Sequence, residues 1–218
     1  MRRAVRGAAP HPRLVTLLVA TRSSGKKAEA RRLLGSAGIE AVFPDDIGVA
    51  VEPAEDLLEM GETFQANARA KAEYFARRSG LPTVADDSGL EVLSLGGLPG
   101  VRSKRWAASV ESGEKLDHAN NAELLRRLLG APASRRRAQY RCVLAFVVTP
   151  GAVPEFFEGA CTGTILESPR GNAGFGYDPL FLSDDLEKTF GEAAAADKDA
   201  VSHRGRAFQQ LIAHLAPR

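Results

Sequence analysis

LPTVADDSG, residues 81–89, is the stretch from which we predict the fold. Its first part, Leu81–Ala85, has the apolar character of a short buried strand. The strand leads into Asp86-Asp87-Ser88-Gly89, which we expect to form a tight turn because Asp, Ser and Gly favour turns. Two adjacent carboxylates at the end of an apolar strand are costly unless a cation lies beside them. Taken alone, this segment predicts either an Asp-rich surface turn or a magnesium site.

Strand and helix patterns also surround this stretch. Thr63 is a suitable N-cap for a preceding helix that runs to about Arg78. Near the start of the sequence, the apolar run Leu14–Ala20 predicts another buried strand. It passes through the turn Thr21–Gly25 into a helix over Lys26–Leu34. The two strand–helix units indicate an α/β protein.

The second half of the sequence predicts a hairpin. Ala138–Val148 and Glu155–Ile165 are rich in aromatic and β-branched residues, and Pro150-Gly151 between them favours a turn. An antiparallel pair joined to the earlier strands makes the sheet mixed. Further expected elements are the strand Leu180–Leu182 and the helices Glu114–Leu129 and Ser202–Leu215.

The amino-acid composition is typical of a globular protein without membrane spans. The sequence is 44% hydrophobic and 26% charged, and no apolar run approaches the roughly 20 residues that a membrane span needs. Four arginines lie in residues 1–13, and without them the net charge of +2 becomes −2. We expect residues 1–13 to be a disordered basic extension and residues 14–218 to form a single domain. The two cysteines, Cys142 and Cys161, fit reduced thiols and a cytoplasmic location.

The segment Thr21-Arg22-Ser23-Ser24-Gly25-Lys26 is a candidate phosphate site. A helix that begins here leaves backbone N–H groups free to hold a phosphate, and Lys26 adds a positive charge. The alternative is that the hydroxyl side chains merely cap the helix. The segment is not a Walker A loop, because Ala20 stands where that motif needs Gly and Lys27 where it needs Ser or Thr.

Three further segments carry candidate ligands, each with an ordinary structural alternative. The acidic residues among 55–62 offer oxygen ligands for a metal, or form a solvated acidic loop. Residues 171–179 combine glycines with two aromatic rings, which suits a pocket for a planar base or a flexible turn. Ser202-His203-Arg204-Gly205 opens the last helix, and Arg204 presents fixed donors for carbonyl or phosphate oxygens or is simply a surface charge.

In combination, five blocks of sequence resemble the inosine/xanthosine triphosphate pyrophosphatase family. They follow one another in the order that the family shows, and the match spans about Leu14 to Leu215. The blocks are Ala20-Thr21-Arg22-Ser23-Ser24-Gly25-Lys26, Gly61-Glu62-Thr63-Phe64-Gln65-Ala66-Asn67-Ala68, Ala85-Asp86-Asp87-Ser88-Gly89-Leu90, Gly174-Phe175-Gly176-Tyr177-Asp178-Pro179 and Ser202-His203-Arg204-Gly205.

This resemblance implies both a fold and an activity. The expected fold is an elongated, two-lobed α/β structure around a central mixed β-sheet flanked by helices, with a nucleotide cleft between the lobes. The expected reaction is the Mg²⁺-dependent hydrolysis of non-canonical purine nucleoside triphosphates, namely ITP, dITP and XTP, to monophosphate and pyrophosphate. The resemblance also implies a homodimer.

By the same resemblance, individual residues acquire roles. Asp87 is the catalytic carboxylate and a magnesium ligand, and Lys26 supports catalysis at the phosphates. Asp86 and Glu59 are the other expected magnesium ligands, although the glutamates near Glu59 align in more than one way. Ser23 stands where the family typically has Asn. The expected substrate-binding residues are Thr21, Arg22, Ser23, Ser24, Gly25, Lys26, Ser88, Phe175, Gly176, Tyr177, Asp178, Lys198, His203 and Arg204.

Other functions stay open at this point. The chain is alternatively a non-catalytic nucleotide sensor, or a pyrophosphatase that prefers a different modified nucleotide. Lys26 and Asp87 favour an enzyme. A nucleic-acid-binding role through Arg135-Arg136-Arg137 is disfavoured by the slightly negative charge beyond the first 13 residues. We therefore expect a purine nucleoside triphosphate as substrate, and neither nucleic acid nor membrane as a partner.

Overall fold

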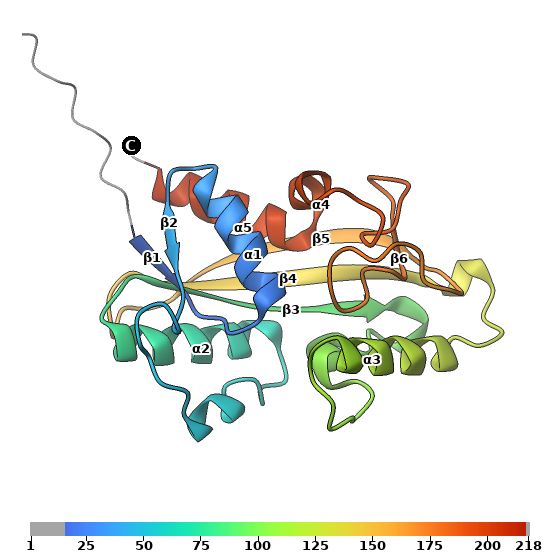
Figure 1. Cartoon of the computed structure of the whole chain (residues 1–218), viewed down its shortest axis with the longest axis horizontal. Coiled ribbons are helices and arrows are strands. Elements are labelled where there is room, and N and C mark those ends of the chain that lie inside the picture. Colours follow the sequence, from blue (N-terminus) through green and yellow to red (C-terminus); the bar gives the residue numbers. More distant parts are fainter. Residues whose placement is uncertain (1–15, 217–218) are drawn as a thin grey trace, which may run out of the picture.

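A six-stranded mixed sheet forms the centre of the computed structural model, which describes residues 16–216 (Figure 1). The strand order is β2-β1-β3-β4-β5-β6; β1 is parallel to β2 and β3, and the remaining neighbours are antiparallel. The predicted α/β class with a mixed sheet is confirmed, whereas the expected extension over residues 1–13 lies outside the described residues. The strands are β1 Thr16–Val19, β2 Glu40–Val42, β3 Thr83–Val92, β4 Arg137–Val147, β5 Glu155–Ile165 and β6 Phe181–Ser183.

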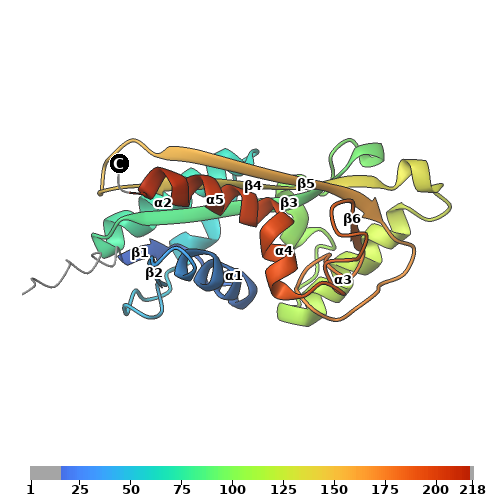
Figure 2. The same cartoon turned by 90° about the horizontal axis from the view of Figure 1, so that it is seen from above.

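The long strands β3, β4 and β5 run through both halves of an elongated molecule (Figure 1). In the first half α1 and α5 cover one face of the sheet and α2 the other, while α3 and β6 belong to the second half (Figures 1 and 2). The helices are α1 Ser24–Gly35, α2 Phe64–Ser79, α3 Gly113–Arg127, α4 Ala195–Val201 and α5 His203–Leu215, with short 3-10 turns η1 Pro53–Leu57, η2 Leu93–Leu95, η3 Gly100–Arg105 and η4 Ala133–Arg135.

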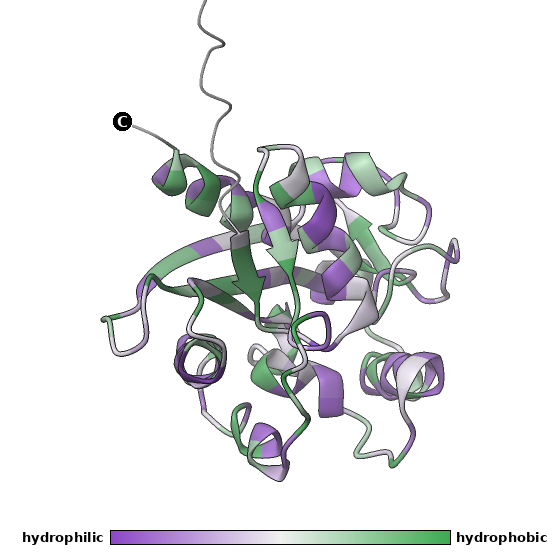
Figure 3. Cartoon of the chain, turned by 60° about the vertical axis from the view of Figure 1, so that its left-hand side comes forward, coloured by the Kyte–Doolittle hydropathy of each residue, from purple (hydrophilic) through white to green (hydrophobic). Residues whose placement is uncertain are grey.

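The buried apolar residues follow the same division. One cluster, which contains Leu17 and Phe208, lies beneath α1 and α5. A second, which contains Leu18 and Phe75, packs α2 against the opposite face of the sheet. A third, with Leu124 at its centre, fills the second half. The hydrophobic colour of β1 in Figure 3 marks the strand that contributes alternate residues to the first two clusters.

Capping residues set the boundaries of the helices that frame the site. The Thr63 hydroxyl accepts a hydrogen bond from the N–H of Ala66 at 3.1 Å, and Gly80 ends α2 with a φ of 72°, which favours glycine. At α5 the Ser202 hydroxyl accepts from the N–H of Gly205 at 3.1 Å. The helices predicted from Thr63 and from Ser202 are therefore confirmed.

One prediction about the fold is wrong. Asp86-Asp87-Ser88-Gly89 do not form a turn, because β3 continues through them and all ten of its residues pair with β4. The long antiparallel partner satisfies the backbone groups that a turn would expose. Alternate residues of a strand point to opposite faces, so Asp86 and Asp87 project to different sides of the sheet. The two carboxylates consequently enter different environments.

Two further predictions concern membrane spans and thiols. Among residues 16–216, no helix combines the length and apolar character needed to cross a bilayer. Cys142 and Cys161 are both free and buried, as expected. Burial raises the pKa of the Cys161 thiol to about 11, so this thiol is uncharged at neutral pH.

Candidate active site

The turn between β1 and α1 directs the N-terminus of α1 toward β3. The Ser23 hydroxyl accepts from the N–H of Lys26 at 3.5 Å, and the Thr21 hydroxyl accepts from the N–H of Ser23 at 3.2 Å. The Ser23 hydroxyl therefore caps α1, and the Thr21 hydroxyl binds the N–H of this cap residue. Lys26 nevertheless reaches the sheet, where its Nζ lies 3.0 Å from Oδ2 of Asp86. The N-terminus of α1, with its partial positive charge, and the Lys26 ammonium thus lie beside the acidic residues of β3.

The Arg22 side chain binds residues of the segment 45–55. Its guanidinium forms a two-point ion pair with Glu55, with both N–O distances at 2.7 Å. It also pairs with Asp45 and donates to the carbonyl of Val49 at 3.1 Å. In this structure the Arg22 side chain fastens the segment 45–55 to the turn, and its expected role in binding substrate stays a prediction. Bidentate arginine–carboxylate pairs are well suited to that role.

Asp86 lies in a buried charge network on the α1 and α5 face. Its Oδ2 accepts from Nε and Nη2 of Arg204, both at 3.1 Å. Arg204 also donates to Ser88 Oγ at 2.7 Å and pairs with Glu29. Burial raises the pKa of Asp86, but Lys26 and Arg204 outweigh burial and hold that pKa far below its ordinary value. The charge of Asp86 is therefore compensated by two protein cations.

Glu29 connects this network to the second half of the molecule. Its Oε1 lies 2.7 Å from Nζ of Lys198, which in turn lies 2.5 Å from Oδ2 of Asp178. Burial opposes ionisation of Glu29, but Arg204 and Lys198 lower its pKa to about 2. The sequence analysis missed Glu29, although it lies three residues after Lys26 and hence on the same face of the helix.

The expected base pocket gathers around the ring of Phe175. Nζ of Lys198 lies 4.9 Å from the ring centroid and Cζ of Arg204 lies 5.6 Å from it, which is the range of cation–π contacts. The ring also lies against Gly25, because a Cβ atom there would come within 2.3 Å of a ring carbon. An aromatic contact therefore bridges the two halves where we expected the nucleotide cleft.

Two expected pocket residues are core residues. The Tyr177 hydroxyl donates to the carbonyl of Ser103 at 2.8 Å. The His203 ring stacks on Tyr140 with centroids 4.6 Å apart, and its Nδ1 lies 4.0 Å from Sγ of Cys161. Burial and the adjacent arginine keep the pKa of His203 well below its ordinary value, so the ring is neutral. Both side chains are 3% exposed and pack in the core, and their role in binding substrate stays a prediction.

Asp87 projects toward α2. Its Oδ2 accepts from Nδ2 of Asn67 at 2.9 Å, and its Oδ1 lies 3.1 Å from Nζ of Lys71. The same ammonium lies 2.8 Å from Oε1 of Glu59. Burial opposes the charge of Lys71, but Asp87 and Glu59 outweigh burial and raise its pKa. Burial likewise opposes ionisation of Glu59, whose pKa is lowered to about 2 by Lys71 and Lys26. Two carboxylates therefore converge on one ammonium.

The sequence analysis did not assign roles to Asn67 and Lys71. They lie four residues apart on α2, so they share one face of the helix and reach the same carboxylate. Asn67 belongs to a block that carried the family resemblance, and that block was the available signal. Lys71 gave no comparable signal, because a lysine in an alanine-rich helix is ordinarily a solvated residue.

The three acids expected to bind magnesium do not gather around one point. Asp87 and Glu59 share Lys71, whereas Asp86 is held on the other face. Within residues 16–216, no three carboxylate, imidazole or thiolate groups lie close enough to hold a metal by themselves. Asp87 and Glu59 still offer the oxygen donors that Mg²⁺ prefers, and Mg²⁺ commonly takes its other ligands from water and substrate phosphates. The residues present fit a magnesium ion whose coordination the substrate completes.

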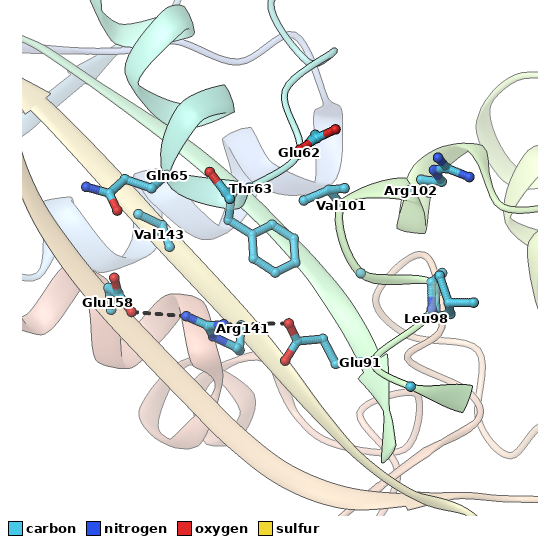
Figure 4. A pocket seen from close by; sticks show the side chains of 15 residues that line it. Glu62, Thr63, Gln65, Glu91, Leu98, Val101, Arg102, Arg141, Val143 and Glu158 are labelled. Carbon is cyan, nitrogen blue, oxygen red and sulfur yellow. Dashed lines mark hydrogen bonds and ion pairs between the residues drawn. The ribbon is translucent and has the colours of Figure 1, made fainter. Parts of the chain in front are cut away.

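A separate groove of about 590 Å³ lies on the α2 side of the sheet (Figure 4). The start of α2, the 96–102 segment and residues of β3, β4 and β5 line it. In Figure 4, Arg141 lies between Glu91 and Glu158, at N–O distances of 3.6 and 3.3 Å. Of the candidate ligands predicted from the sequence, Glu62 alone, one of the acidic residues among 55–62, lines this groove.

Known proteins resemble this chain over nearly its full length. Residues 17–214 match the model of the Ham1 family. A dITP/XTP pyrophosphatase of Frankia alni is 45% identical over 200 residues, which cover 91% of this chain and 96% of that protein. One of Nocardia farcinica is 46% identical over 206 residues, which cover 93% and 96%. The structure of a HAM1 protein from Coxiella burnetii matches with a TM-score of 0.78 at 35% identity, covering 93% of this chain and 98% of that one. The chain therefore belongs to the Ham1 family.

Proposed function

We propose that this protein hydrolyses the purine nucleoside triphosphates dITP, ITP and XTP to monophosphate and pyrophosphate, and so removes them from the nucleotide pool. The names of its relatives, dITP/XTP pyrophosphatases, support this activity. The observation that carries the proposal is the arrangement around β3. Asp87 faces Lys71 on one side of the strand, while Lys26 at the start of α1 meets Asp86 on the other.

The reaction follows from the charges of these groups. Magnesium, held by Asp87 and Glu59, would supply positive charge to the triphosphate. Asp87 accepts a proton from the water that attacks the α-phosphorus. Asn67 and Lys71 hold the Asp87 carboxylate in position for that step. Lys26 and the free N–H groups of α1 stabilise the charge that develops on the phosphoryl oxygens, and pyrophosphate leaves.

Recognition of the base is assigned to the second half of the molecule. The Phe175 ring offers a surface on which a purine stacks, with Lys198 beside it. Among the described residues, Arg204 makes four hydrogen bonds with three acceptors, which leaves one of its five N–H donors for a substrate carbonyl. Inosine and xanthosine carry a carbonyl at the purine 6-position, whereas adenine carries an amino group. Adenine would therefore leave a buried donor unpaired.

A panel of substrates tests the proposal. Pyrophosphate release with Mg²⁺ from dITP, ITP and XTP should exceed release from dATP by at least about a hundredfold, since buried donors without partners strongly disfavour the wrong base. Release should stop when the metal is chelated. Tight binding of dITP without turnover would instead identify a nucleotide sensor. Faster hydrolysis of a modified pyrimidine triphosphate would identify a different house-cleaning pyrophosphatase.

We propose that the active form is a homodimer. The sequence resemblance to the inosine/xanthosine triphosphate pyrophosphatase family supports this assembly. Light scattering on the purified protein should give twice the chain mass of 23.3 kDa. A mass equal to one chain at micromolar concentration would contradict the proposal. A cytoplasmic location stays a prediction.

A further inference from the structure

Two side chains of helix α3 form hydrogen bonds with Gly176, in the loop that contains Phe175; these two bonds are called the grip below. Oδ2 of Asp117 accepts a hydrogen bond from the N–H of Gly176 at 2.8 Å. Nδ2 of Asn121 donates to the carbonyl oxygen of the same glycine at 3.0 Å. Asp117 and Asn121 lie four residues apart, so they share one face of α3. Both backbone groups of Gly176 are thereby held by a single helix.

The backbone conformation of Gly176 sets the position of the Phe175 ring. Gly176 has a φ of 63°, a conformation that glycine adopts readily and that places its neighbours in different directions. On one side of it, the Phe175 ring lies against Gly25 in the phosphate turn. On the other side, the Tyr177 hydroxyl is bound to the carbonyl of Ser103. A shift of Gly176 would therefore move the ring across the junction of the two halves.

Helix α3 is a firm anchor for this grip. Leu124 is fully buried in the apolar cluster of the second half. Asn120 holds a different loop, because its Oδ1 accepts from the N–H of Ala107 at 2.8 Å and its Nδ2 donates to the carbonyl of Lys104 at 3.1 Å. The adjacent amides Asn120 and Asn121 thus fasten two loops to one helix.

Of the two polar atoms in the Asn121 side chain, only Nδ2 has a hydrogen-bond partner among the described residues. Its Oδ1 is buried, and within the described residues it has no hydrogen-bond partner. An unpaired buried acceptor costs free energy, so stability alone does not account for an amide at this position. The donation from its Nδ2 to the loop is the contact that the side chain does make.

We propose that Asp117 and Asn121 are positioning residues for recognition of the nucleobase. They act through the backbone of Gly176 and present the Phe175 ring to the planar base of a purine triphosphate. This inference rests on the proposed role of the Phe175 loop in binding the base. The proposed phosphate-binding residue, Lys26, lies on a different helix, α1, which the Phe175 ring contacts at Gly25.

Steady-state kinetics with dITP test the inference. Asp117→Ala removes the first hydrogen bond, and Asn121→Asp replaces the second donor by a carboxylate oxygen that repels the Gly176 carbonyl. In each variant KM for dITP should rise about tenfold while kcat stays within about twofold. Asp117→Asn retains an oxygen acceptor and should keep KM near the wild-type value. Glu114→Ala, at an exposed position one turn earlier on α3, is the matched control and should change neither constant.

A competitor without a base separates positioning from general damage. Inorganic tripolyphosphate carries the phosphates alone, so its inhibition constant should be the same in all variants. Hydrogen exchange provides a readout that needs no substrate, because the Gly176 amide should exchange faster in Asp117→Ala. Thermal unfolding is measured alongside, and Asn121→Asp tests the grip from the other end if Asp117→Ala does not fold.

Two results would overturn the inference. One is an unchanged KM for dITP in Asp117→Ala and Asn121→Asp despite faster exchange at Gly176. The other is an equal weakening of dITP and tripolyphosphate, which would indicate a general disturbance of the site. A wild-type protein that does not hydrolyse dITP would contradict the proposed function instead, so the two failures are distinguishable.

Discussion

Asp86 and Asp87 are neighbours in the sequence but lie in electrically different regions. On the α1 and α5 face, two cations surround Asp86, which neutralises its charge. On the α2 face, Asp87 and Glu59 share the buried ammonium of Lys71, and Glu59 also lies 3.5 Å from the exposed guanidinium of Arg105. The first region is closed by its own buried ion pairs, whereas the second has one buried ammonium for two carboxylates, whose oxygens suit a divalent cation. Because successive side chains of β3 point to opposite faces of the sheet, Asp86, which stabilises the fold, is separated from Asp87, which we assign to catalysis.

The strongest way to break this comparison is to neutralise the Asp87 carboxylate. Asp87→Asn removes the proton acceptor, and turnover of dITP should fall by at least about a thousandfold. The free energy of unfolding should change little, because Lys71 keeps its pair with Glu59. Steady-state kinetics and urea unfolding measure the two effects. Wild-type turnover in a folded variant would refute the assignment.

The same substitution at Asp86 should act mainly on stability. Asp86→Asn leaves Arg204 without one of its two buried acidic partners and leaves Lys26 without its acid. The free energy of unfolding should fall by about 3 kcal/mol, since removing one member of a buried ion pair exposes the other to an unfavourable environment. Urea unfolding at neutral pH checks this. If the two variants lost stability equally, the distinction between the two regions would fail.

Lowering the pH should destabilise the charge network around Asp86, because Glu29 becomes protonated. The folded state lowers the pKa of Glu29 from 4.5 to about 2, so its contribution to stability is complete above the unfolded value and is lost as pH falls toward 2. Between about pH 7 and about pH 3, the wild-type protein should lose about 2 kcal/mol more of its unfolding free energy than Glu29→Gln. Urea unfolding at both pH values measures the difference. Equal losses in the two proteins would show that Glu29 carries no such shift.

The smallest effect is expected at the α1 cap. Ser and Asn are similarly good N-caps, so Ser23→Asn should change the free energy of unfolding by less than about 0.5 kcal/mol. The KM for dITP should change less than about threefold, because backbone N–H groups and Lys26 bind the phosphates. Kinetics across a dITP series checks this. A KM lowered tenfold would mean that the side chain at position 23 contacts substrate directly.

Local signals predicted much of the fold. Thr63 and Ser202 cap the helices that the sequence pattern placed there, and β4 and β5 form the hairpin that their aromatic and β-branched residues and Pro150-Gly151 predicted. The course of β3 through Asp86-Asp87-Ser88-Gly89 was not predictable from composition, since the strand that pairs with it lies about fifty residues further along the chain. The short strand β2 and helix α4 offered too few residues for a periodic pattern.

The site was predictable where a residue belonged to one of the five blocks or, like Glu59 and Lys198, took its expected role from the family resemblance outside them. Lys26, Asp87 and Arg204 were found in this way, and the structure places each of them at β3 or in contact with it. Glu29 and Lys71 were missed, because the value of a buried charge depends on partners that only the folded chain brings together. Aromatic character in a glycine-rich segment does not distinguish Phe175, which faces the junction, from the buried Tyr177.

The central claim is that water, activated by Asp87, attacks the α-phosphorus of a purine triphosphate. Hydrolysis of dITP in water enriched in heavy oxygen tests it directly, with the products separated and weighed by mass spectrometry. We predict one dIMP and one pyrophosphate for each dITP consumed, with the heavy oxygen in dIMP. Heavy oxygen in pyrophosphate, or formation of dIDP and orthophosphate, would contradict the account.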